Sequence, residues 1–210
     1  SASNFAVANG VVTYSGPDEW SYSRFILHNA ALCVASGGVD GFSIGSEMRE
    51  LTKIRGAAGF PAVEALQGLA AEVRTLLGPD VKIGYCADWS EYFGFNENGD
   101  RLFHLDPLWA DANIDFIGID NYMPLSDWRD EEGEADGAFG SVYNLDYLED
   151  NILGGEGYDW FYHSPEARDA QIRTPITDVE HSEPWIWRYK DIVGWWSSDH
   201  HERVNGVRSQ

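Results

Sequence analysis

The segment Ser43-Ile44-Gly45-Ser46-Glu47-Met48-Arg49-Glu50 joins an apolar run to a carboxylate. The run from Val39 to Ile44 contains β-branched residues and ends at Gly45-Ser46, which predicts a buried strand. Glu47 follows just beyond the C-terminal end of this strand. A second apolar run, residues 114–119, ends in the same way at Asp120. In parallel α/β folds, and above all in (β/α)8 barrels, chemistry collects at the C-terminal ends of strands, so function is expected along this edge.

Helix and strand patterns alternate over the first 120 residues, after an irregular lead-in at residues 1–15. Pro and acidic residues at 16–19 predict the start of a helix that stops at Gly37-Gly38, and Pro61 and Gly78 bound the next helix. A strand is predicted at residues 81–85, and Asp88 and Trp89 follow its end. The remaining expected elements are a hairpin turn at 96–100, a short helix near 107–112, helices at 143–153 and 164–172, and a Trp-rich helical tail at 185–196.

This alternation is typical of a parallel sheet flanked by helices. A complete (β/α)8 barrel needs eight strands and about 250 residues, whereas only three strands are convincing here and the tail at 205–210 shows no terminating element. We therefore expect residues 1–210 to form a single α/β domain that is the central part of a TIM-barrel-like fold. A smaller open sheet is the alternative.

The composition excludes several classes of partner. The chain has 35 acidic and 14 basic residues and a net charge of −21, so neither nucleic acid nor an anionic membrane surface is expected to bind it. No apolar stretch approaches 18 residues and no signal peptide begins the sequence. We therefore expect synthesis in the cytoplasm, without insertion into a membrane. The two cysteines, Cys33 and Cys86, are expected to be buried free thiols.

Glu47 is the leading catalytic candidate. A carboxylic acid at a strand end suits the proton donor of glycoside hydrolysis, which needs a second carboxyl as nucleophile or base. The alternative is an acid that interacts with the first turn of a helix. Asp88 and Asp120 are the other strand-end acids, and Arg49 lies close by, whereas Glu180 is expected in a loop.

Aromatic residues accompany these acids. Sugar rings bind flat aromatic faces, and Trp89 and Tyr122 each lie within two residues of a strand-end acid, so both are expected to contact a substrate. For most of the other aromatic residues, core packing is expected. Histidine and cysteine spacings predict neither a metal site nor a cofactor site. The acidic loop at 130–136 has the composition but not the alternating pattern of a calcium site, and a solvated loop is expected.

Several segments together resemble the TIM-barrel-like domain of baseplate hub proteins from gene transfer agents and related phage tails, which are often called host specificity proteins. These segments are 14–22, 24–28, 37–40, 44–49, 115–128, 173–178, 188–191 and 194–196. That family is in turn similar to clan A glycoside hydrolases. The resemblance places Glu47 at the acid/base position after strand four and Tyr122 at the tyrosine after strand six.

Two departures from that pattern matter. Ser46 stands where many clan members have Asn, and the nucleophilic Glu after strand seven is expected beyond residue 210. The resemblance thus implies a portion of the barrel from about strand four to strand six, with flanking helices. It implies a glycosidase-like module that acts on or binds cell-envelope polysaccharide or peptidoglycan. It also implies contacts with other tail or baseplate proteins and assembly of the protein into a particle. The chain alone is expected to be inactive. Its open sheet edges predict either self-association or coverage of the edges by the Trp-rich tail at 185–196. The alternatives are a structural hub domain without catalysis and a carbohydrate-binding module built on Trp89 and Tyr122.

Overall fold

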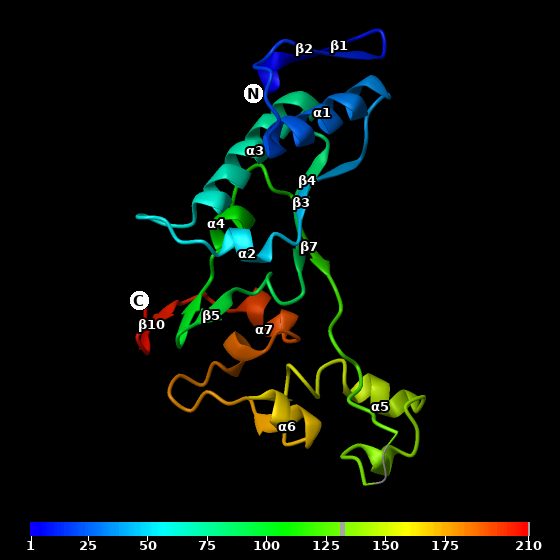
Figure 1. Ribbon diagram of the computed structural model, residues 1–210, viewed down its shortest axis with the longest axis vertical. Coiled ribbons are helices and arrows are strands. Elements are labelled where there is room, and N and C mark those ends of the chain that lie inside the picture. The colour runs from blue at the N-terminus through cyan, green and yellow to red at the C-terminus, as the bar shows by residue number, and fades with distance from the viewer. Residues whose placement is uncertain (131–132, 210) are drawn as a thin grey trace. The chain divides into compact units, whose positions relative to one another are not determined.

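The computed structural model describes residues 1–130 and 133–209, and these form a mixed α/β chain with several small sheets (Figure 1). The chain divides into two compact units, residues 1–120 with 202–210, and residues 121–201. The described residues contain no closed barrel. Within them, every helix is too short or too polar to span a bilayer.

The centre of the first unit is a three-stranded parallel sheet. Its strands are β3 (Gly41–Ser46), β4 (Lys82–Asp88) and β7 (Phe116–Asp120), in the order β3-β4-β7. Ile83, Tyr85 and Ala87 alternate along β4 and are fully buried. The three predicted parallel strands are confirmed, each a few residues further along the chain than the apolar runs indicated.

Two long helices pack together beside this sheet (Figure 1). Helix α1 (Tyr22–Ala35) begins at Ser21, whose hydroxyl accepts from the Arg24 N–H, and ends before Gly37, which has φ +102°. Helix α3 (Pro61–Leu77) begins with Pro61 and buries an apolar face that contacts β3 and β4. The predicted start of the first helix at residues 16–19 is wrong, because the capping hydroxyl that satisfies the first turn is Ser21.

Three hairpins turn on Asn-Gly pairs. Strands β1 (Phe5–Ala8) and β2 (Val11–Tyr14) are joined by Asn9-Gly10, strands β5 (Phe95–Glu97) and β6 (Asp100–Leu102) by Asn98-Gly99, and strands β10 (Arg203–Val204) and β11 (Val207–Arg208) by Asn205-Gly206. All six turn residues have positive φ, as the tight type I′ turn requires. The irregular lead-in predicted at 1–15 is therefore wrong, and the tail at 205–209 contributes a strand, β11.

The C-terminal hairpin completes a second sheet with the order β11-β10-β6-β5, in which Arg203 lies opposite Arg101. Short helices fill the rest of the first unit: η1 (Ala2–Asn4), α2 (Arg49–Thr52) and α4 (Asp106–Trp109). Helix α2 starts two residues after Glu47, so the strand end and the following helix share one short turn.

The second unit has little regular structure. Its elements are η2 (Gly137–Phe139), α5 (Leu145–Asp150), β8 (Trp160–Phe161), α6 (Pro165–Asp169), β9 (Thr174–Pro175), η3 (Pro184–Trp187) and α7 (Ile192–Ser197). The two helices predicted at 143–153 and 164–172 are confirmed in shorter form. The predicted helical tail is divided into η3 and α7.

Candidate functional site

Glu47, Asp88 and Asp120 lie at the C-terminal ends of three neighbouring parallel strands. Asp88 and Asp120 are the last residues of β4 and β7 and face each other in register, and Glu47 directly follows β3. This edge of the sheet, defined by Glu47, Asp88 and Asp120, is called the acidic edge below. The three residues lie at the same edge of the sheet, as their positions after apolar runs predict.

A hydrogen bond links the two outer strands at the acidic edge. Strand β4 lies between β3 and β7, yet the Ser46 hydroxyl on the last residue of β3 donates to Asp120 Oδ2 at the end of β7, over 2.8 Å. The register between β3 and β4 shifts between Ser43 and Ser46, just before this contact.

Two glycines allow close approach at this sheet, one between strands and one between β3 and α1. A Cβ at Gly118 would lie 2.6 Å from the Cys86 sulfur, and a Cβ at Gly45 would lie 2.7 Å from the Tyr22 hydroxyl. That hydroxyl donates to the Ile44 carbonyl of β3 over 2.7 Å. Cys33 and Cys86 are free thiols and half-buried.

Glu47 is exposed and has a left-handed backbone, with φ +52°. This conformation is uncommon for a residue other than Gly, Asn or Asp and persists where its surroundings fix it. The Glu47 N–H donates to the Cys86 carbonyl over 2.9 Å, and the next N–H, of Met48, donates to the Tyr85 hydroxyl over 2.7 Å. Both acceptors belong to β4, so the central strand sets the direction in which Glu47 projects.

A buried polar cluster of Thr52, Tyr85, Glu91 and His104 supports that turn. The Glu91 carboxylate accepts from the Thr52 hydroxyl at 2.6 Å, the Tyr85 hydroxyl at 3.1 Å and the Asp88 N–H at 3.2 Å. Burial raises the pKa of Glu91 above its ordinary value, although these three donors oppose the shift. Burial, with the nearby Glu91 charge, also raises the pKa of Tyr85, so its hydroxyl stays protonated and donates.

Sequence reasoning did not identify this buried cluster. The signal was present in Glu91, an acid three residues beyond a strand-end aspartate. However, its role depends on Thr52 and His104, which the sequence places 39 residues before it and 13 residues after it. The cluster positions the turn beneath the acidic edge.

The two aspartates of the acidic edge are already engaged by neighbours. Asp88 Oδ1 accepts from both the N–H and the hydroxyl of Ser90, which closes a local turn. Asp120 accepts from Ser46. Each aspartate therefore has a structural partner. A ligand would bind to the remaining lone pairs of its carboxylate oxygens.

The predicted substrate-contacting residues differ in their surroundings. Arg49 is exposed on α2 beside Glu47, and Trp89 is half-buried in the turn after β4. Tyr122 belongs to the second unit and is 72% exposed. Among the other aromatic residues, Tyr92, Phe93 and Trp185 are buried, as expected for core residues. Glu180 lies in a loop, as predicted.

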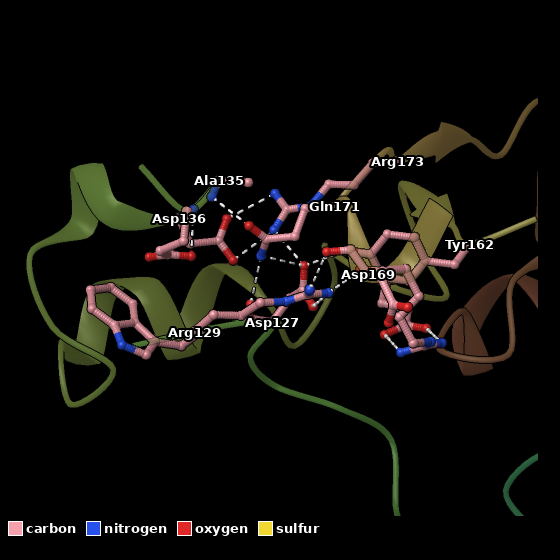
Figure 2. A network of polar contacts seen from close by, with 12 residues as sticks. Asp127, Arg129, Ala135, Asp136, Tyr162, Asp169, Gln171 and Arg173 are labelled. Atoms are coloured by element: carbon pink, nitrogen blue, oxygen red, sulfur yellow. Dashed lines mark hydrogen bonds and ion pairs between the residues drawn. The ribbon is translucent and has the colours of Figure 1, made fainter. Parts of the chain in front are cut away.

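The second unit is organised around Arg173 (Figure 2). Its guanidinium donates to both oxygens of Asp136 and to Asp127 Oδ2, each over 2.8 Å. The hydroxyls of Tyr162 and Tyr147 donate to Asp127 and Asp136 over 2.5 Å and 2.7 Å. Burial alone would raise the pKa of Asp136, but the hydrogen bonds from Arg173 and Tyr147 outweigh it and hold this pKa below its ordinary value. These bonds connect loops that have little regular structure, although Arg173 Nε is buried and has no hydrogen-bond partner among the described residues.

The acidic loop at 130–136 enters this network at its C-terminal end. Asp136 binds Arg173, and Glu131 and Glu132 lie outside the described residues. Within the described part of the chain, no group of three His, Cys, Asp or Glu side chains is arranged to hold a metal ion.

Comparison with known proteins identifies the family. A comparison with curated proteins finds no match. The family model described as "GTA TIM-barrel-like domain" matches residues 20–210, which is nearly the whole chain. The parallel sheet with its flanking helices lies within that range. The chain therefore belongs to the GTA TIM-barrel-like domain family, a family of domains related to gene transfer agents.

Proposed function

We propose that the acidic edge engages cell-envelope glycan, polysaccharide or peptidoglycan, as part of a hub or tail protein of a gene-transfer-agent-type particle during host recognition. The observation that carries this proposal is the convergence of Glu47, Asp88 and Asp120 on one edge of a parallel sheet. Carboxylates that accept hydrogen bonds from sugar hydroxyls, beside aromatic faces, are the groups that glycan recognition needs.

Within this proposal, Glu47 has the position of a proton donor. It is exposed, and two backbone hydrogen bonds to β4 fix the turn that carries it. Retaining hydrolysis needs a second carboxyl about 5–5.5 Å away as nucleophile. The resemblance to clan A glycoside hydrolases implies a nucleophile outside residues 1–210, so we assign Asp88 and Asp120 to binding. The chain alone then binds glycan without turning it over.

Trp89 and Arg49 are the proposed additional contacts at the acidic edge, where the guanidinium of Arg49 suits acidic or hydroxyl groups. Tyr122, which is 72% exposed, is proposed separately as a flat face for a sugar on the second unit.

A structural hub domain without catalysis is the second candidate. The hydrogen bonds of Asp88 to Ser90 and of Asp120 to Ser46 favour it, because both carboxylates stabilise the sheet edge without any ligand. Contacts with other tail or baseplate proteins would then be the main role of the domain.

Binding measurements separate the two candidates. Purified residues 1–210 are titrated with host envelope polysaccharide and with solubilised peptidoglycan, and reducing-end release measures turnover. We expect saturable binding, weakened about tenfold by Glu47→Gln, and no turnover. Glu180→Gln is the matched control, since Glu180 is exposed in a loop and its substitution should leave the affinity unchanged. Failure of both glycans to bind the folded chain would favour the structural role, and turnover sensitive to Glu47→Gln would show that the nucleophile lies within the chain.

A further inference from the structure

A polar cavity of about 260 Å³ lies in the first unit beside α2 and the β5–β6 hairpin. Its walls include Arg49, Lys53, Glu91, Asn96, Arg101 and His104. The volume is below the roughly 300–1,000 Å³ typical of sites for drug-sized ligands, so it suits a small group with at most one ring. Three basic side chains line this one cavity although the chain carries a net charge of −21.

Arg101 dominates the chemistry of the cavity. It is fully buried, and its Nη2 donates to the Phe93 carbonyl over 2.6 Å. Its Nε and Nη1 have no hydrogen-bond partner among the described residues. The guanidinium carbon lies 4.3 Å from the centroid of the Phe93 ring and 5.3 Å from that of Phe103, so aromatic groups fix its plane. A buried cation with unsatisfied donors is costly unless an acceptor is supplied.

The one carboxylate in the cavity wall does not supply that acceptor. Glu91 already accepts from Thr52, Tyr85 and the Asp88 N–H. The charges of Asp106 and Tyr92 act on Arg101 only at a distance, without a hydrogen bond to Nε or Nη1. Lys53, with its side chain 32% exposed and paired with Glu50, and the exposed Arg49 add positive charge to the cavity wall.

His104 contributes a different group. Burial, then the charges of Arg101 and Lys53, lower the pKa of His104 to about 3, so its ring is neutral. The Thr52 hydroxyl gives its proton to Glu91 at 2.6 Å, so the 3.2 Å contact with His104 Nε2 needs the ring proton on that nitrogen. His104 Nδ1 is then an acceptor, and it has no partner within the described residues.

We propose that this cavity binds an oxyanion, a carboxylate or a phosphate, through the free guanidinium nitrogens of Arg101, with Lys53 and Arg49 adding attraction. A hydroxyl on the ligand donates to His104 Nδ1. Arginine is suited to this role because its planar fork matches the oxygens of carboxylate and phosphate. The site is distinct from the acidic edge, since the two share only Arg49 among the residues assigned to them, and it stands whether or not the acidic edge binds glycan.

The test is a titration of residues 1–210 with inorganic phosphate, sodium glucuronate and glucose, followed by NMR at the Arg101 Nε–H. We expect phosphate and glucuronate to shift this signal saturably and glucose to leave it unmoved. Phosphate binding tighter than glucuronate identifies a phosphorylated group, and the reverse order identifies an acidic sugar; both support the site. Lys53→Met should weaken phosphate binding about fivefold to tenfold. The matched control is Lys82→Met, at a side chain that is 65% exposed and does not line the cavity.

Arg101→Lys keeps the charge but removes the planar fork, so it should weaken binding more than tenfold. Circular dichroism shows whether this variant folds. If it does not, the phosphate affinities of Lys53→Met and Lys82→Met still test the proposal. Absence of saturation with both anions would overturn the proposal. Equal effects of the two lysine variants would also overturn it, because binding would then follow surface charge alone.

Discussion

At the scale of single residues, the candidate site depends on one backbone conformation. A left-handed glutamate costs about 1–3 kcal/mol and needs compensation from its surroundings. The Cys86 carbonyl and the Tyr85 hydroxyl provide it by accepting the N–H groups of Glu47 and Met48. The orientation of the acid is thus set by the central strand of the sheet.

Tyr85→Phe tests this arrangement. The substitution removes the acceptor of the Met48 N–H and one donor to Glu91, so we expect the free energy of unfolding to fall by about 1–3 kcal/mol. Urea unfolding followed by circular dichroism measures the change. Tyr143→Phe, at a side chain that is 86% exposed, is the control and should change stability by less than about 0.5 kcal/mol. Equal effects of the two substitutions would show that the Tyr85 hydroxyl does not support the turn.

His104 predicts a dependence of stability on pH. Its pKa is about 3 in the folded state and about 6.5 in the unfolded chain, so between these values the unfolded state binds more protons. Stability therefore falls as the pH is lowered from about 6.5 to 3, by at most about 1.4 kcal/mol per pH unit from this group. His104→Gln should remove that part of the slope and leave the slope above pH 7.5 unchanged. If the free energy of unfolding, measured with urea, changes equally with pH for both proteins between pH 4.5 and 6.5, the assignment is contradicted.

At the scale of secondary-structure elements, long helices and buried strands could be predicted, and short polar elements could not. Helix α3 has Pro61 at its start, Gly78 at its end and apolar residues at helical spacing between them, so each local signal agrees. The hairpins at 5–14 and 203–208 were missed although each contains Asn-Gly, the same turn signal that identified the hairpin at 95–102. Strand length does not separate the three hairpins, because the identified one has strands of three residues and the others have strands of two to four, so the Asn-Gly pair was the available signal in each.

The end of α5 depends on a distant lysine that no local pattern indicates. Lys190 is 2% exposed, and its ammonium donates to the carbonyls of Asn151 and Gly154 over 2.8 and 2.9 Å. Burial lowers the pKa of Lys190 to about 8. It therefore satisfies two carbonyl groups in the segment that directly follows the helix.

Lys190→Met should leave these two carbonyls without donors. We expect a loss of about 2–3 kcal/mol in the free energy of unfolding at pH 7, where the lysine is still largely charged. Lys82→Met removes an exposed lysine and should cost less than about 1 kcal/mol. Thermal unfolding compares the two variants. Equal losses of stability would show that the Lys190 contacts contribute little to the stability of the fold.

At the scale of the whole molecule, the sequence correctly predicted the α/β class, the three parallel strands and the positions of Glu47, Asp88 and Asp120 at their ends, whereas Tyr122, expected on the same edge, belongs to the second unit. Glu47, Asp88 and Asp120 each follow an apolar run directly, and that local signal suffices to place them. The buried cluster around Glu91, the Arg173 network and the Arg101 cavity escaped prediction because their members are separated in the sequence and meet only through packing. The glycan and the catalytic partner of Glu47 remain proposals.

Self-association is the expectation at this scale. Strands β3 and β7 have no further strand partner among the described residues, so parts of their outer edges are open to pairing with another chain. A net charge of −21 opposes this contact at low ionic strength, and about 0.15 M salt shortens the range of the repulsion to about 8 Å. We expect light scattering to show dimers or larger species that increase with protein concentration and with salt from about 0.01 to 0.15 M. A monomer throughout this range would contradict edge pairing.

The hydrogen bond between Ser46 and Asp120 also has a consequence for biosynthesis. Its partners are 74 residues apart, so at about 5–20 residues per second Ser46 is synthesised roughly 4 to 15 s before Asp120. The loop that this bond closes cannot form until β4 is in place between its ends. The acidic edge is therefore assembled late on the ribosome, and a nascent chain that stops before β7 should leave Glu47 more accessible to a Glu-specific protease than the finished domain does.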